Sequence, residues 1–178
     1  MDLRVKRTIK NIKDAFFELR KKKSLDKISV KELSELAMIN KATFYLHYRD
    51  IYELSDTLEN ELIERIISDV HNINLTKENL KWFTETLSRS ILKNNDYIET
   101  LFSGYDDNQF INHLEISLKS YIFQTFPWIK NNSENNILLS FLIQGSFRTY
   151  IRNSNIDKDV LLDTTSNIMM RILSEYTF

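Results

Sequence analysis

Apolar residues recur every three or four positions along most of the chain, which is the spacing of one face of an α-helix. In residues 3–23, for example, Ile12 and Phe16 fall on the same face. Capping residues mark where several of these stretches begin, as where Ser29 stands three positions before Glu32. The predicted helices cover residues 3–23, 30–37, 41–47, 51–70, 76–92, 97–102, 108–125, 133–152 and 157–176.

The chain of 178 residues contains only two glycines and one proline. Sheets and hairpins depend on these residues for their turns, whereas long helices avoid them, so the composition predicts an all-α fold of about nine helices. No cysteine is present, which excludes disulfides and thiolate metal sites. The longest apolar run is far shorter than the ~20 residues that span a membrane, and no signal peptide is visible. We therefore expect a cytoplasmic protein without a membrane partner.

Charge is distributed unevenly along the chain. Residues 1–50 hold thirteen Lys and Arg against seven Asp and Glu, a net charge of +6, and the remainder has a net charge of −7. A basic segment favours a polyanionic partner, because neutralising phosphates drives sequence-independent affinity. A solvated helix face explains a bare charge count equally well, so the charge alone does not decide between the two.

Residues 29–48, SVKELSELAMINKATFYLHY, have the pattern of two short helices joined by a tight turn. A helix-turn-helix needs a bracing helix, a turn and a second helix with polar residues that enter the major groove. In this segment the polar side chains of the second helix are Lys41, Thr43, Tyr45 and His47. The expected shared core comprises Leu33, Leu36, Ala37, Ile39 and Phe44.

A family resemblance sharpens this interpretation. Residues 36–48, LAMINKATFYLHY, resemble the recognition segment of the TetR/AcrR family of bacterial transcriptional regulators, and residues 49–54, RDIYEL, resemble its entry into the fourth helix. The resemblance implies a helix-turn-helix DNA-binding domain at residues 1–50 and a helical effector-binding and dimerisation domain at 51–178. It also implies a homodimeric repressor that binds a palindromic operator on double-stranded DNA and is released by a small-molecule effector.

The resemblance implies DNA contacts at particular positions of this chain. Most of them lie on the second helix of the motif, one lies at the start of the first helix, and nearby cations add further contacts. The implied DNA-binding residues are Arg4, Lys6, Arg7, Ser29, Lys41, Ala42, Thr43, Tyr45, His47 and Arg49.

Two residues depart from the family's pattern. Met38 stands where the turn usually has glycine, so we expect a non-glycine residue with a positive φ at some energetic cost. Ile51 stands where a phosphate-binding lysine is common, which removes one contact. These departures keep open an alternative function, a TetR-like protein-binding adaptor or co-regulator that does not bind DNA specifically.

The C-terminal domain is rich in aromatic residues, most of which belong to the core at this helical spacing. Some would line an effector pocket between helices, where polar groups orient the ligand. Our candidates for the effector site are Trp82, Phe102, His113, Phe141, Gln144 and Arg148. The last two helices have wide apolar faces, which predict a two-fold dimer interface. Its candidate residues are Phe141, Leu142, Gly145, Leu161, Thr164, Ile168 and Ile172.

An enzyme finds little support in the sequence. The three histidines are far apart, and none follows a glutamate at the spacing of helical di-iron sites. The chain has no glycine-rich phosphate loop and no cysteine nucleophile. We therefore predict no catalytic residues, no metal site and no cofactor.

Overall fold

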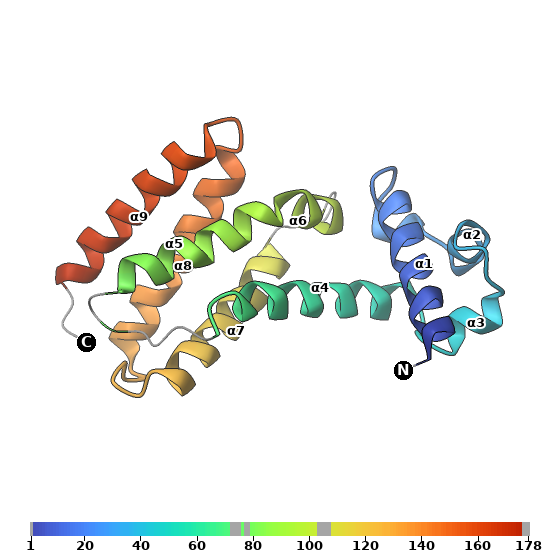
Figure 1. Cartoon of the computed structure of the whole chain (residues 1–178), viewed down its shortest axis with the longest axis horizontal. Helices are drawn as coiled ribbons and strands as arrows, with labels where there is room; N and C mark the ends of the chain where they lie inside the picture. Colours follow the sequence, from blue (N-terminus) through green and yellow to red (C-terminus); the bar gives the residue numbers. More distant parts are fainter. Residues whose placement is uncertain (1, 72–75, 77–78, 103–107, 176–178) are drawn as a thin grey trace. The chain divides into compact units, whose positions relative to one another are not determined.

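Figure 1 shows the computed structural model of the chain, which describes residues 2–71, 76, 79–102 and 108–175. The described residues form nine α-helices and one short 3-10 helix, and no strand occurs among them. The predicted all-α fold is therefore confirmed. The elements are α1 (Leu3–Arg20), η1 (Leu25–Lys27), α2 (Val30–Leu36), α3 (Lys41–Tyr45), α4 (Ile51–Ser68), α5 (Leu80–Lys93), α6 (Asn95–Phe102), α7 (Asn108–Thr125), α8 (Ser133–Arg152) and α9 (Lys158–Glu175).

The helices belong to two compact units. The head unit comprises Met1–Glu61 and Asp96–Asp107, and the body unit comprises Leu62–Asn95 and Asn108–Phe178. The sequence instead suggested a division at residue 50. Helix α6 belongs to the head unit because Tyr97 contacts Phe17 of α1 and the Leu101 carbonyl accepts from Arg20 of α1. None of the helices described in the structure is both long and apolar enough to cross a membrane.

In the head unit, α1 packs against α2, and α2 packs against α3. Two side chains of α1 bind residues that are distant in sequence. The Lys13 ammonium lies 2.5 Å from the Glu61 carboxylate on α4. The guanidinium of Arg20, only 1% exposed, donates from Nη2 to the Leu101 carbonyl near the C-terminus of α6 at 2.6 Å. A buried cation is tolerated where carbonyl oxygens accept its protons, and the C-terminal end of a helix is a favourable place for it.

In the body unit, α5 packs against α8 and α9, α7 packs against α8, and α8 lies beside α9 (Figure 1). A cluster of buried side chains that includes Phe83, Ile122 and Phe126 forms one part of its core. The buried Tyr121 hydroxyl donates to the Val70 carbonyl at 2.9 Å, which ties α7 to the end of α4 within this unit. Such a core of aromatic and aliphatic side chains supplies most of the free energy of folding.

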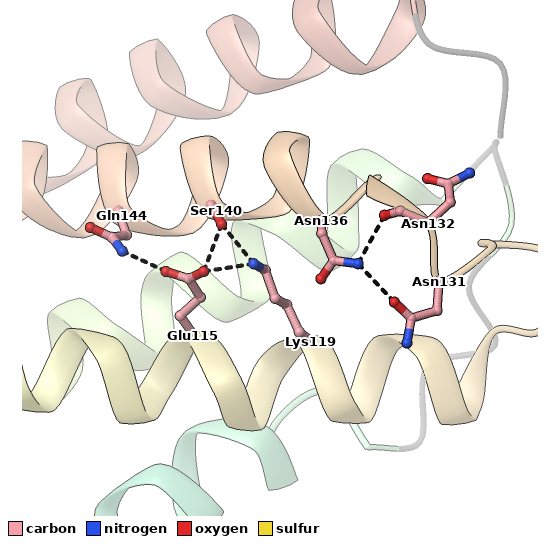
Figure 2. Close-up of polar contacts among 7 residues, drawn as sticks. All are labelled: Glu115, Lys119, Asn131, Asn132, Asn136, Ser140 and Gln144. Atoms are coloured by element: carbon pink, nitrogen blue, oxygen red, sulfur yellow. Dashed lines mark hydrogen bonds and ion pairs between the residues drawn. The ribbon is translucent and has the colours of Figure 1, made fainter. Parts of the chain in front are cut away.

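A polar network joins α7 to α8 on the side of the body unit shown in Figure 2. The Glu115 carboxylate accepts from Lys119 Nζ at 2.6 Å, from Ser140 Oγ at 2.7 Å and from Gln144 Nε2 at 2.6 Å. Burial acts to raise the pKa of Glu115, but these three hydrogen bonds outweigh it and hold the pKa below its usual value. The network therefore favours the ionised form of Glu115 and links α7 to α8.

Helix starts agree with the predictions where a capping side chain acts locally. Asp50 Oδ1 accepts from the Glu53 N–H at 2.8 Å as the N-cap of α4, and Glu53 Oε2 accepts from the N–H of Arg49, the residue before the cap, at 2.5 Å. The prediction of a helix from Thr76 is wrong, because α5 begins only at Leu80. The Asn79 side chain accepts from the Thr76 N–H at 2.7 Å, so this backbone group is satisfied by a turn before the helix.

Candidate nucleic-acid interface

The turn between α2 and α3 has the geometry that a helix-turn-helix requires. The Ile39 N–H donates to the Ser34 carbonyl at 3.0 Å and the Met38 N–H donates to the Glu35 carbonyl at 3.2 Å, the paired bonds of a Schellman motif. Met38 occupies the left-handed position of this motif with φ of 56°, as the sequence predicted. Its side chain is 90% exposed, so the turn places a strained residue at the surface.

Helix α3 buries one residue and exposes most of the others. Phe44 is completely buried and lies 5.8 Å, ring centroid to ring centroid, from the buried Tyr48. This anchor leaves Lys41, Ala42 and Tyr45 at the surface, with Tyr45 56% exposed. Thr43 and His47, the other two predicted contacts at this helix, are partly buried. Because the buried Phe44 holds α3 in place, the positions of the outward side chains of this helix are fixed as well.

Part of the predicted contact set comes together in one surface groove beside α3. The groove is lined by Arg4 and Arg7 from α1 and by Asn40 and Thr43 from the start of α3. Glu35 also lines it and supplies the one carboxylate among its lining residues. Two guanidinium groups next to the first turn of α3 make this groove suited to a phosphate of a nucleic-acid backbone.

The structure separates Lys6 from these two arginines. Lys6 lines a different surface groove, with Lys10 and Lys13 of α1 and Tyr97 of α6. The separation follows from the helical period, because Arg4 and Arg7 are three residues apart on one face and Lys6 lies on another. The two N-terminal arginines are therefore better placed beside α3 than Lys6 is.

The remaining predicted contacts, Ser29 and Arg49, lie at helix starts. Ser29 is exposed, and its hydroxyl accepts from the Glu32 N–H at 3.2 Å as the N-cap of α2. The side chain of Arg49 is 83% exposed, and its Nε lies 3.3 Å from the Glu53 carboxylate. A partner that offers a phosphate would compete with Glu53 for this guanidinium, since an exposed ion pair contributes little stability.

Two apolar residues lie differently from the sequence pattern. Leu36 was expected in the core but is 47% exposed, because the short helix α2 turns Leu33 and Ser34 inward and Leu36 falls on another face. Leu46, at the end of α3, is 81% exposed and was missed. The signal was available in the sequence, because Phe44 and Tyr48 define the inward face and Leu46 falls between them. An exposed apolar side chain there is suited to a thymine methyl group.

Ile51 begins α4 and is only 5% exposed. The residue that stands in place of the family's phosphate-binding lysine thus belongs to the core of the head unit. Its apolar side chain offers a phosphate no hydrogen bond, so the start of α4 lacks the cation that a lysine at this position would supply.

The predicted effector residues lie outside the described lining of the cavity in the body unit. A cavity of about 80 Å³ lies among α5, α7, α8 and α9, and none of the six candidates contributes to its described lining. Gln144 donates to Glu115 in the network described above, and Arg148 on the same helix is half-buried. Three candidates, Trp82, His113 and Phe141, are exposed on α5, α7 and α8, and Phe102 is buried in the head unit.

The predicted dimer residues fall into two groups. Phe141, Gly145, Thr164 and Ile168 are exposed on α8 and α9, and Ile172 is half-exposed. A Cβ added at Gly145 would meet no atom within 4 Å, so the surface above it is open. The other two residues, Leu142 and Leu161, are buried in the body unit's own core and are not accessible to a second copy.

Solved structures of regulators share this fold along nearly the whole chain. A TetR-like transcriptional regulator from Rhodococcus sp. RHA1 matches with a TM-score of 0.65 and 16% identity, covering 99% of this chain and 98% of that chain. The fatty acid degradation regulator FadR from Bacillus halodurans matches with a TM-score of 0.61 and 10% identity, covering 92% of this chain and 94% of that one. The dihydroxyacetone kinase operon activator DhaS matches with a TM-score of 0.60 and 18% identity, covering 96% and 98%. No protein-family model and no curated protein matches the sequence.

Proposed function

We propose that this chain, which has the fold of TetR-like regulators, is a DNA-binding transcriptional regulator that acts as a homodimer. Its head unit contacts the major groove through α3 and the DNA backbone through the start of α1. The observation that carries this proposal is the placement of Lys41 and Tyr45 outward on α3 beside the groove that Arg4 and Arg7 line. Cations hold phosphates in such an arrangement while the exposed helix reads base edges.

Dimerisation is supported by exposed apolar residues on two neighbouring helices of the body unit. Phe141 on α8 is 65% exposed and Ile168 on α9 is 53% exposed, and the open surface at Gly145 lies on the same helix as Phe141. Apolar area of this kind is stabilised when a second copy removes it from water. Two heads about 34–36 Å apart would read a palindrome on one side of the duplex.

We further propose that the regulator is a repressor and that an effector bound in the body unit weakens DNA binding. The cavity among α5, α7, α8 and α9 is the described space that supports this part of the proposal. An effector acts only if it binds the DNA-free conformation more tightly than the DNA-bound one.

The test is selection of binding sites by the full chain from a pool of random DNA duplexes, followed by footprinting on the DNA upstream of the protein's own gene. We expect enrichment of a palindrome and protection of a site that contains it, with affinity that falls steeply as salt rises. Failure to enrich any sequence at low salt, from a sample that is folded and dimeric, would reject the DNA-binding proposal.

Two residues of the head unit favour a second function, an adaptor that binds another protein and no specific DNA. Met38 and Ile51 each depart from the pattern of a DNA-binding head, and Ile51 offers no cation at the start of α4. This function predicts the opposite outcome of the selection experiment, in which the folded protein enriches no sequence.

A further inference from the structure

The cavity in the body unit has an almost entirely apolar lining. It has a volume of about 80 Å³, and the fifteen described residues that line it include no charged side chain. Eleven of them are Leu, Ile or Phe, and one is Met169. Only Thr84, Ser88 and Ser146 bring a hydroxyl group. The chemistry of any ligand therefore depends on what these three hydroxyls have left to offer.

Each of the three hydroxyls already donates its proton to a backbone carbonyl. Thr84 Oγ1 donates to the Lys81 carbonyl at 2.8 Å, and Ser88 Oγ donates to the Thr84 carbonyl at 2.7 Å. Ser146 Oγ donates to the Leu142 carbonyl at 2.5 Å. A hydroxyl has a single proton to donate, so none of the three can donate to a ligand without breaking a bond within its own helix.

The acceptor side of one hydroxyl is occupied as well. The buried Tyr150 hydroxyl donates to Ser88 Oγ at 2.6 Å, and it lies 3.0 Å from Thr165 Oγ1 on α9. This contact joins α5, α8 and α9 next to the cavity and uses Ser88 for structure. The hydroxyl groups of the lining are therefore already used in hydrogen bonds within the protein.

We propose that this cavity binds an uncharged, hydrocarbon-like group of a few carbon atoms, and that the effector of the regulator carries such a group. A carboxylate or phosphate placed there would find neither a cation nor a free donor, and burying an unpaired charge costs many kcal/mol. An alkyl group would instead gain contacts with Leu, Ile and Met side chains. Apolar cavities of roughly 150 Å³ bind benzene or xenon, so the smaller cavity in this chain selects a smaller group.

The binding part of this inference stands on the lining alone, whereas the effector part rests on the proposed function. Binding is therefore measured on the free full chain, with methyl groups of Leu, Ile and Met observed by NMR. The two probes are propane and propionate, which have three carbons each and differ in charge. We expect saturable shifts of lining methyls such as those of Met169 with propane, and no such shifts with propionate at the same concentration at pH 7.

Ser146→Leu adds three carbons in place of the hydroxyl group and is expected to weaken propane binding at least about tenfold, because the leucine occupies the volume that the probe needs. Ser174→Leu is the matched control, since Ser174 is exposed on α9 and lies outside the lining. It should leave the propane affinity unchanged. Where Ser146→Leu lowers the free energy of unfolding too far, Ile143→Phe fills the same space from the same helix.

Propionate binding at the lining methyls as tightly as propane would overturn the proposal, as would undiminished propane binding in both folded cavity-filling variants. DNA binding is measured separately. Absence of propane-induced shifts in a protein that binds DNA rejects the cavity proposal and leaves the proposed function standing. Shifts in a protein that never binds DNA reject the proposed function and leave the cavity proposal standing.

Discussion

The head unit and the body unit expose different chemistry. On the head unit, the exposed side chains around α3 include Lys41 and Tyr45 as well as the apolar Leu46, and the buried Phe44 holds the helix that carries them. On the body unit, the exposed side chains of α8 and α9 include large apolar residues such as Phe141, and the interior contains a cavity whose described lining has no charged residue. One unit is thus built to meet a polyanion, and the other is built to remove apolar groups from water.

This difference teaches where each kind of partner can be recognised. A polyanion needs cations that water still reaches, because its affinity comes largely from the release of counterions. A hydrocarbon group or a second copy of the chain gains affinity from burial, which requires area rather than charge. Each of the following predictions changes one unit and compares the variant with a matched control or with the wild type.

The largest expected effect comes from placing a charge on the body unit's apolar face. Phe141→Glu should raise the dimer dissociation constant by about a hundredfold or more, because an anion would be buried against a second copy. Operator binding should fall with it, since two heads are needed for a palindrome. Sedimentation measures the dimer, and Ile116→Glu is the control, because Ile116 is 67% exposed on α7. Equal dimer dissociation constants for the two variants would show that Phe141 and α8 are not part of the interface.

The next effect concerns the head unit. Lys41→Ala and Tyr45→Ala should each weaken operator binding by about ten- to a hundredfold, the cost of one good contact, without a matching loss of thermal stability. Lys130→Ala, which removes the same charge from an exposed site in the body unit, is the control for Lys41→Ala. If melting temperature falls in proportion to DNA affinity, the assignment of these residues to DNA contact is wrong.

A smaller effect tests the strained turn in the head unit. Met38→Gly should raise the free energy of unfolding by about 1 kcal/mol, because glycine adopts positive φ without the penalty of a Cβ. Met38→Ala keeps the Cβ and should bring no such gain. Urea denaturation of the two variants measures the difference, and equal stabilities would show that the turn stores no strain.

The smallest effect is a pH dependence located in the body unit. The pKa of Glu115 is lowered in the folded chain, so its network stabilises the fold above the pKa of an unfolded glutamate, about 4.3, and the contribution is lost as pH falls from there through the folded pKa. Glu115→Gln should therefore lose less stability than the wild type between pH 7 and pH 4. Urea denaturation at both pH values measures the free energy of unfolding of the two proteins. An equal loss in the wild type and in Glu115→Gln would contradict the role of Glu115.

Local signals in the sequence predicted the fold well. Caps such as Asp50 before α4 act on backbone groups three residues away, so they can be found without knowing what the helix packs against. The positive φ of Met38 was predictable for the same reason, since the turn itself demands it. Helix α7 was predicted with its observed bounds, because Pro127 ends it two residues later.

The sites that depend on packing could not be predicted in this way. Phe141 and Leu142 are neighbours on α8, and both belong to its wide apolar face. Leu142 lies in the core, where residues of α9 cover it, whereas Phe141 is exposed. The effector candidates lie outside the described lining of the cavity for a related reason. His113, Gln144 and Arg148 were chosen for polarity, whereas the cavity is lined by Leu and Ile side chains that look like ordinary core in the sequence.

The central claim is that cations of the head unit meet DNA phosphates while α3 meets the bases. The most direct test is the salt dependence of operator affinity for the full chain and for Lys41→Ala. The account predicts a steep linear fall of log affinity with log salt in the wild type, and a slope that is shallower by about one in the variant. Affinity that does not change with salt, or that is equal for the operator and a scrambled duplex, would contradict it.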